Sequence, residues 1–232
     1  MSITHLPTGD EKFQAVQTMF DQIAPRYDLM NRLMTLGLDQ SWRRNGLRAI
    51  GVNADDRVFD IACGTGDLVE MAKATGAEVY GVDFAHGMLR SARRRGIDAA
   101  LIQGDAGRLP LPDGAATVVT CGFALRNFVD MGSAIREMGR ILSPGGRLLV
   151  LEVHEPGNRL LRLGHGFYFQ RVVPLLGALL SDRDAYAYLP KSVAYLPADD
   201  AFFKLFRDAG FENIRRKPLL FGAAQMITGS KA

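Results

Sequence analysis

The sequence has 232 residues, 47% of them hydrophobic, and a formal net charge of only +3. A chain of this length can bury one full hydrophobic core, so we expect a single domain over residues 1–232. The weak positive charge argues against nucleic acid as a partner, and no apolar run reaches the roughly 18 to 20 residues needed to span a bilayer.

The first part of the chain, residues 1–50, is predicted to be a helical arm or lid. Phe13, Val16, Phe20 and Ile23 recur at steps of three and four, which indicates an amphipathic helix over residues 10–24 that Pro25 ends. Shorter helical patterns follow at residues 28–35 and 39–50. Tyr27 lies beside the break, where lids commonly turn.

Residues 51–153 alternate short apolar runs with helical segments, which predicts a parallel sheet covered by helices. The expected strands are residues 58–61, 78–82, 99–103, 117–122 and 147–153, with a turn at Ser143-Pro144-Gly145-Gly146 before the last one.

Between residues 154 and 197 the alternation stops, and an aromatic and aliphatic insertion takes its place. It either extends the core or forms a hydrophobic substrate wall that also touches a membrane surface. Residues 198–232 are predicted to form a helix and two strands paired as a hairpin.

The motif Val-Phe-Asp-Ile-Ala-Cys-Gly-Thr-Gly-Asp-Leu at residues 58–68 is typical of a loop between a strand and a helix that binds a nucleotide. A dinucleotide site needs a third glycine, but Val69 occupies that position. Asp60 would repel a diphosphate and attract an ammonium group, while Gly64 and Gly66 let a ligand approach the backbone. The loop therefore favours S-adenosylmethionine, and a turn used only for packing is the alternative.

Polar residues also follow the next two predicted strands. Asp83 can accept both hydroxyls of a ribose, although a lone acid at a strand end is often a helix cap. Asp105 can accept from an adenine amino group while the backbone N–H of Ala106 donates to the ring. Ligands of open parallel sheets bind at the carboxyl ends of the strands, so we expect these residues to share one site with the glycine loop.

These features resemble the class I S-adenosylmethionine-dependent methyltransferases, and four further segments resemble the menaquinone and ubiquinone biosynthesis C-methyltransferases. The segments are residues 20–31, 123–127, 142–147 and 184–193. The resemblance implies a Rossmann-like α/β fold with a mostly parallel seven-stranded sheet whose last strand is antiparallel. It also implies that Thr65, Asp83, Asp105 and Ala106 contact the cofactor. Gly122 stands where the family often has serine, so any contact there would come from the backbone.

The leading functional hypothesis is C-methylation of a polyprenylated quinol, most directly 2-demethylmenaquinol, with S-adenosylhomocysteine as by-product. Arg126, Asn127 and His154 are the candidates for handling the quinol hydroxyl, and histidine has the most suitable intrinsic pKa for a base. Tyr27 would close over the sulfonium, and Tyr186 and Tyr188 would line the ring pocket. No metal is needed.

Two alternatives stay open: methylation of another apolar aromatic or polyketide metabolite, and a non-catalytic quinone or lipid carrier. The expected partners are a prenylated quinol and, peripherally, a membrane surface, with a homodimer left open. Because the two cysteines form no bridge framework and no spanning run is found, we expect a cytoplasmic protein, at most peripheral to the inner face of the membrane.

Overall fold

The computed structural model describes residues 7–158, 166, 171, 188 and 191–232. Seven strands form one sheet in the order β3-β2-β1-β4-β5-β7-β6. The strands are β1 (Arg57–Ile61), β2 (Glu78–Asp83), β3 (Ala100–Gln103), β4 (Ala116–Gly122), β5 (Leu142–Val153), β6 (Phe211–Leu219) and β7 (Ala224–Lys231). Only β7 runs against its neighbours, because the pairs from β3 to β5 are parallel and both pairs made by β7 are antiparallel. The predicted α/β fold with one antiparallel last strand is confirmed.

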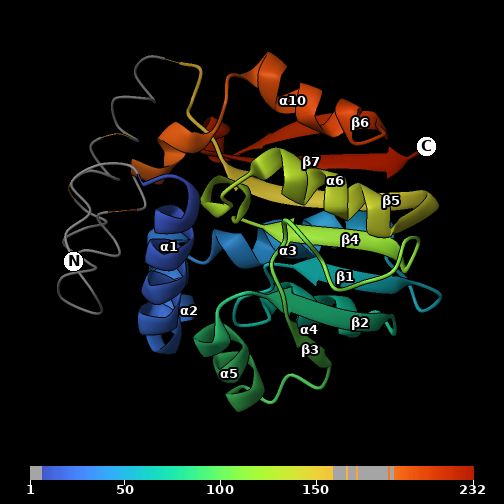
Figure 1. Ribbon diagram of the computed structural model, residues 1–232, viewed down its shortest axis with the longest axis horizontal. Helices are drawn as coiled ribbons and strands as arrows, with labels where there is room; N and C mark the ends of the chain where they lie inside the picture. The colour runs from blue at the N-terminus through green and yellow to red at the C-terminus, as the bar shows by residue number, and fades with distance from the viewer. Residues whose placement is uncertain (1–6, 159–165, 167–170, 172–187, 189–190) are drawn as a thin grey trace.

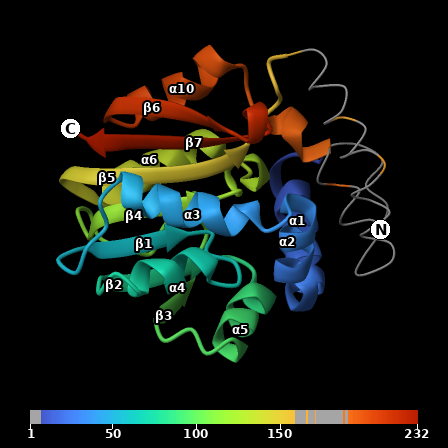
Figure 2. The same cartoon turned by 180° about the vertical axis from the view of Figure 1, so that it is seen from behind.

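Helices cover both faces of this sheet (Figures 1 and 2). The helices are α1 (Gly9–Ile23), α2 (Tyr27–Thr35), α3 (Leu38–Ala49), α4 (Asp67–Lys73), α5 (His86–Arg94), α6 (Met131–Ile141) and α10 (Asp199–Asp208). Short 3-10 turns occur at η1 (Ala24–Arg26), η2 (Leu125–Asn127), η4 (Val193–Tyr195) and η5 (Leu220–Gly222). The predicted break at Pro25 is the turn η1, and α1 and α2 stand at the carboxyl ends of the parallel strands (Figure 1).

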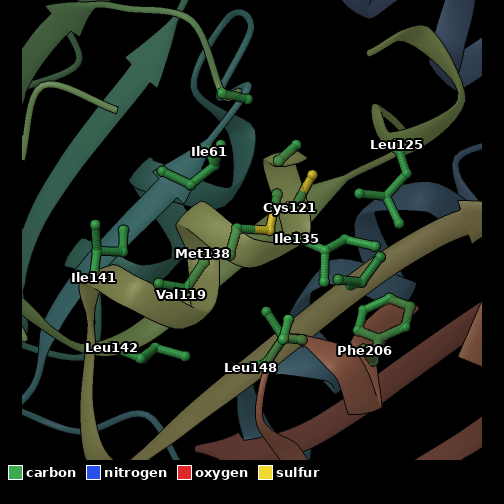
Figure 3. Close-up of a cluster of buried hydrophobic side chains, with 14 of the residues drawn as sticks. Ile61, Val119, Cys121, Leu125, Ile135, Met138, Ile141, Leu142, Leu148 and Phe206 are labelled. Carbon is green, nitrogen blue, oxygen red and sulfur yellow. The ribbon is translucent and has the colours of Figure 1, made fainter. Parts of the chain in front are cut away.

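Alternating residues of the central strands build two hydrophobic layers. Ile61, Val119 and Leu148 face α6 and α10 and form the layer drawn in Figure 3. Val58 and Leu149 face the other way, toward α3 and α4. Because side chains on a strand alternate between faces, a two-sided apolar strand places helices on both sides of the sheet.

The strand β5 begins earlier than the sequence predicts. The expected turn at Ser143–Gly146 lies within the strand, because Leu142 already pairs with Ala116 and the Ser143 hydroxyl donates to the Ala116 carbonyl at 3.0 Å. The pairing then shifts, so that Val118 is opposite Arg147, and Gly145 has a φ of +73°. The segment bends as a turn would, but it does so as an irregularity inside a paired strand.

Much of the predicted insertion at 154–197 lies outside the described residues, Tyr186 among them. Tyr188 is described: it is buried among residues of α1, η1 and α5, with no hydrogen-bond partner for its hydroxyl. In the part of the chain that the structure describes, no helix is both long and apolar enough to cross a bilayer. The division of the chain into arm, core and insertion stays a prediction.

The contact between α6 and α10 gives a test of the packing. A Cβ at Gly139 would lie 2.7 Å from the backbone oxygen of Ala209, which cannot move without shifting the end of α10. Gly139→Ala is therefore expected to lower the free energy of unfolding by about 1–3 kcal/mol, measured by denaturant titration. Gly132→Ala in the same helix is the control, since its new Cβ would meet mainly the mobile tip of Arg136 at 3.2 Å. Equal stability of the two variants would contradict this packing.

Candidate active site

The glycine loop and the end of β2 are joined by one carboxylate. Asp83 accepts hydrogen bonds from the backbone N–H of Gly64 and of Ala85, each at 2.8 Å. Gly64 and Gly66 have φ values of +57° and +92°, which residues with a side chain seldom adopt. A Cβ at Gly66 would also lie 3.1 Å from Ile97, so the loop needs glycine at this position for both conformation and space.

Strain at two other strand ends marks the same edge of the sheet. Ala62 after β1 and Phe123 after β4 have φ values of +56° and +61°, in the left-handed region. Such conformations cost energy at residues other than glycine and concentrate at functional sites. Both residues line a small cavity with Tyr27, Gly64 and Asp83.

Asp83, Asp105, Ala106 and Asn127 come together around a second small cavity. The Asp105 carboxylate accepts from the backbone N–H of Gly107 at 3.0 Å, which shapes the turn after β3. Asn127 is 7% exposed, and neither its amide nitrogen nor its amide oxygen has a partner. Because a buried amide without partners is costly, this side chain is a candidate for binding a ligand.

Two buried carboxylates beside the loop have unusual protonation behaviour. Burial raises the pKa of Asp60 to about 7, although the hydrogen bond from Thr120 at 2.6 Å opposes the shift. Burial likewise raises the pKa of Asp83 to about 6, against the effect of its two backbone hydrogen bonds. Both groups would be stabilised as carboxylates by a cationic or hydrogen-bond-donating ligand.

Asp60 shares its cavity with Arg43, Thr65 and Gly122. Arg43 comes from α3, is 6% exposed, and donates to Asp39 at 2.7 Å. Opposite charges therefore face one small cavity, which suits the ammonium and carboxylate of an amino acid. The Thr65 hydroxyl donates to Asp28 of α2, so its predicted contact with the cofactor would have to displace this bond or use the backbone.

Arg95, at the end of α5, fastens the N-terminal arm to the loop. Its guanidinium donates to Asp28 at 2.9 Å, to Asp67 at 2.8 Å and to the carbonyl oxygen of Thr65 at 3.1 Å. Asp28 belongs to the arm, whereas Thr65 and Asp67 belong to the loop and the first turn of α4. This cluster holds α2 against the glycine loop.

Tyr27 occupies the junction of the site. Its side chain lines the two small cavities at the glycine loop and also a larger cavity of about 380 Å³. A Cβ at Gly64 would lie 3.9 Å from its ring, and Phe20 packs edge-on against it. Burial raises the pKa of Tyr27 despite a hydrogen bond with Asn31, so its phenol stays protonated near neutral pH.

The larger cavity has mostly apolar walls. Its described lining comes from the arm, from the residues after β4 and β5, and from η5, and includes Met34, Leu38, Trp42, Phe123, Val153, Leu220 and Phe221. Arg126 is the charged group on the side of β4 and is itself 6% exposed. Its guanidinium donates to Glu152 at 2.5 Å, to Ser192 at 3.1 Å and to the Phe123 carbonyl at 2.6 Å.

His154 lies apart from this group. It lines a different cavity, together with Asp199 and Gln225, and none of the predicted cofactor residues lines that cavity. Its ring contacts the Gly222 carbonyl at 3.2 Å, Arg216 at 3.3 Å and Asp199 at 3.5 Å. The structure thus brings Tyr27 and Asn127 to the glycine loop and Arg126 to the adjoining apolar cavity, but it brings His154 to neither.

Sequence reasoning missed Arg43, Arg95 and Glu152. Arg43 and Arg95 stand in basic clusters that read as solvated helix ends, and their neighbours Arg44 and Arg94 are indeed exposed. Only the i, i+4 spacing of Asp39 and Arg43 could have suggested a pair. Glu152 is fully buried within an apolar strand, where a lone acid signals a buried partner.

Comparisons with known proteins bear on this geometry. The chain is 46% identical to the demethylmenaquinone methyltransferase of Thermus thermophilus over 92% of this chain and 100% of that protein. It is 43% identical to the demethylmenaquinone methyltransferase of Deinococcus radiodurans, over 97% of each chain. A protein of Geobacter sulfurreducens named ubiquinone/menaquinone biosynthesis C-methyltransferase UbiE is 39% identical, over 95% of this chain and 90% of its own length.

Solved structures support the fold. An S-adenosylmethionine-dependent methyltransferase of Thermotoga maritima matches with a TM-score of 0.66 at 20% identity, over 94% of this chain and 100% of that one. The [4+2]-cyclase SpnF matches with the same TM-score of 0.66 at 17% identity, over 97% of each chain. Since proteins named for different reactions share this fold, the fold alone does not assign a reaction.

The sequence assigns the family, because the model of the ubiE/COQ5 methyltransferase family matches residues 8–231. The chain belongs to the ubiE/COQ5 methyltransferase family.

Proposed function

We propose that this protein transfers a methyl group from S-adenosylmethionine to a ring carbon of a prenylated quinol, most directly 2-demethylmenaquinol. The observation that carries the proposal is the meeting of two kinds of cavity at Tyr27 and Phe123. On one side lies the polar loop with Gly64 and Asp83, and on the other an apolar cavity of about 380 Å³. The names of the curated relatives supply the substrate class.

The polar residues fit the proposed cofactor part by part. Asp83 would accept from the ribose hydroxyls, and Asp105 with the Ala106 N–H would bind the adenine. Asp60 would face the ammonium group, and Gly64, Gly66 and Gly122 would let the ligand approach the backbone. The unpartnered amide of Asn127 would gain the hydrogen bonds that it lacks. When bound, the cofactor supplies an electrophilic methyl group on a sulfonium.

The apolar cavity would orient the quinol ring and exclude water. Tyr27 lies between this cavity and the loop, so its ring would shield the reacting carbon from solvent. Arg126, held by Glu152, would stabilise the negative charge that develops on the quinol oxygen. Arginine stays protonated in proteins, so Arg126 is not itself the base. His154 lines another cavity, and we leave it out of the proposed catalytic group.

An acceptor assay tests this proposal. The purified chain is given cofactor labelled in the methyl group and either a short-tailed demethylmenaquinol or a demethoxy-benzoquinol, and mass spectrometry locates the added carbon. We expect methylation of the naphthoquinol at the ring carbon. Methylation at oxygen, or of unrelated aromatic compounds in preference, would favour the alternative of another aromatic or polyketide acceptor. Cofactor binding without transfer to any acceptor would contradict an enzymatic role.

Replacing Asn127 distinguishes a role in ligand binding from a role in folding stability. Replacing a buried amide that has no partner with leucine of similar size removes a desolvation cost, so Asn127→Leu should keep or raise the melting temperature of the ligand-free protein. The same change should lower the rate of methyl transfer at least about tenfold, because it removes hydrogen bonds made only to ligands. Parallel losses of stability and activity would show that Asn127 supports the fold instead.

The raised pKa of Asp83 predicts how cofactor affinity changes with pH. Hydrogen bonds from ribose hydroxyls favour the ionised form of Asp83, so protonation of this carboxylate below about pH 6 should weaken cofactor binding. The loss of affinity should approach about tenfold per pH unit. The stability of the ligand-free protein changes in the opposite direction. Because folding raises the pKa of this carboxyl, its contribution to the free energy of unfolding increases as pH falls from about 6 toward 4. Calorimetric titration across this range measures the affinity, with Asp83→Asn as the control. That variant should bind weakly and with a flatter pH dependence, and a wild-type affinity independent of pH would refute the ribose contact.

A further inference from the structure

Exposed large apolar side chains gather in two segments that are far apart in sequence. In the part of the chain that the structure describes, seven such side chains are exposed. Six of them lie between α2 and the first residue of α3 or in η5: Leu29, Leu33, Leu36, Leu38, Leu220 and Phe221. We call these six the apolar rim. The seventh, Val129, lies elsewhere.

The rim is continuous with the mouth of the apolar cavity. Leu36, Leu38, Leu220 and Phe221 all line that cavity, so the two segments meet there. Leu29 and Leu33 are four residues apart and therefore share one side of α2, and Leu36 directly follows the last residue of that helix. The rim thus extends from the cavity mouth along one side of α2, the helix labelled beside α1 in Figure 2.

The backbone holds the most exposed of these side chains outward at a cost. Leu36 is 85% exposed and Phe221 is 79% exposed, and both have left-handed backbone angles, with φ values of +52° and +54°. Glycine or asparagine would relieve this conformation and remove the apolar exposure at once. Leucine and phenylalanine at these positions disfavour the folded monomer in water through both backbone strain and apolar exposure. This combination indicates a surface that a binding partner covers.

Charge identifies what covers it. Residues 26–48 contain five arginines and two aspartates, and the two aspartates are paired with Arg95 and Arg43. Arg32 lies 3.6 Å from Asp67, whereas Arg44 and Arg48 are exposed. Residues 213–222 contain Arg215, Arg216 and Lys217; Arg216 is paired with Asp199 at 2.7 Å, and both Arg215 and Lys217 are exposed. Lys217 is exposed and pairs across the sheet with Met226, which packs in the same layer as Trp42 of α3. Positive charge therefore flanks the rim on the α3 side of the sheet.

We infer that the apolar rim docks on an anionic lipid bilayer and opens the cavity directly to it. Apolar side chains at the interface and basic residues beside them are the combination that binds such surfaces. A quinol with a prenyl tail would then pass between bilayer and cavity without crossing water. The inference rests on the proposed function for the ligand that takes this path, but docking itself needs neither quinol nor cofactor.

Vesicle flotation of the full chain, without quinol or cofactor, tests the inference. We expect the protein to float with vesicles of phosphatidylcholine containing about 30% phosphatidylglycerol and much less with phosphatidylcholine alone. The double variant Leu36→Asn/Phe221→Asn should bind the anionic vesicles at least about tenfold more weakly. Asparagine tolerates the left-handed conformation, so the melting temperature of this variant should not fall.

Two further variants keep the test decisive. Leu29→Gln/Leu33→Gln changes the stripe on α2 outside the cavity and should also weaken vesicle binding, whereas Val129→Asn, matched in exposure but outside the rim, should leave it unchanged. Wild-type protein that does not float, or rim variants that float like wild type, would overturn the inference. So would rim variants that only change the oligomeric state in sedimentation, because the rim would then join two copies of the chain. Vesicle binding that persists when the acceptor assay fails would separate docking from the proposed reaction.

Discussion

The cluster around Arg95 is the interaction on which the candidate site depends. One guanidinium binds Asp28 of the arm together with Asp67 and the Thr65 carbonyl of the glycine loop. The side chains of Arg95, Asp28 and Asp67 are 25%, 18% and 10% exposed, so water screens these ion pairs less than it screens surface pairs. The bond from Thr65 to Asp28 and the fully buried Met30 add to this attachment of α2. Loss of the Arg95 cluster would remove the charged part of it. Tyr27 would then be held less firmly between the polar and the apolar cavities.

Buried polar groups at the site indicate where ligand binding gains free energy. Asp60 and Asp83 are buried carboxylates whose pKa values are raised to about 7 and about 6, and Asn127 has a buried amide without partners. Each of these groups costs stability in the ligand-free protein. A ligand with a positive charge and hydroxyl or amine donors offsets those costs, whereas a pyrophosphate would add repulsion. The same electrostatics therefore favour a sulfonium nucleoside over a dinucleotide.

The two halves of the site are built from different parts of the chain. Around the loop, hydrogen-bonding groups sit on the short segments after β1, β2 and β3. The apolar cavity is assembled from the arm, the residues that follow β4 and β5, and η5. Arg126 and Glu152 belong to this second half, where their 2.5 Å ion pair fixes the Arg126 guanidinium at a cavity whose walls are mostly apolar. A charged group in such surroundings acts strongly on a developing negative charge because little water screens it.

The sequence by itself determined where the core strands and the glycine loop lie along the chain. It also determined that Asp83, Asp105 and Ala106 lie at strand ends. These follow from local rules, since an apolar run sets a strand and a parallel sheet brings the carboxyl ends of its strands to one edge. Tertiary structure alone decided which basic residues turn inward, so that the buried Arg43 and the partly buried Arg95 reach the site while Arg44 and Arg94 are exposed. It also decided that Asn127 lines one cavity with Asp83 and Asp105 and that His154 turns to Asp199. The pattern of a sequence shows which residues can be buried, but which charges meet is set by packing between segments such as Asp28 and Arg95, which are 67 residues apart.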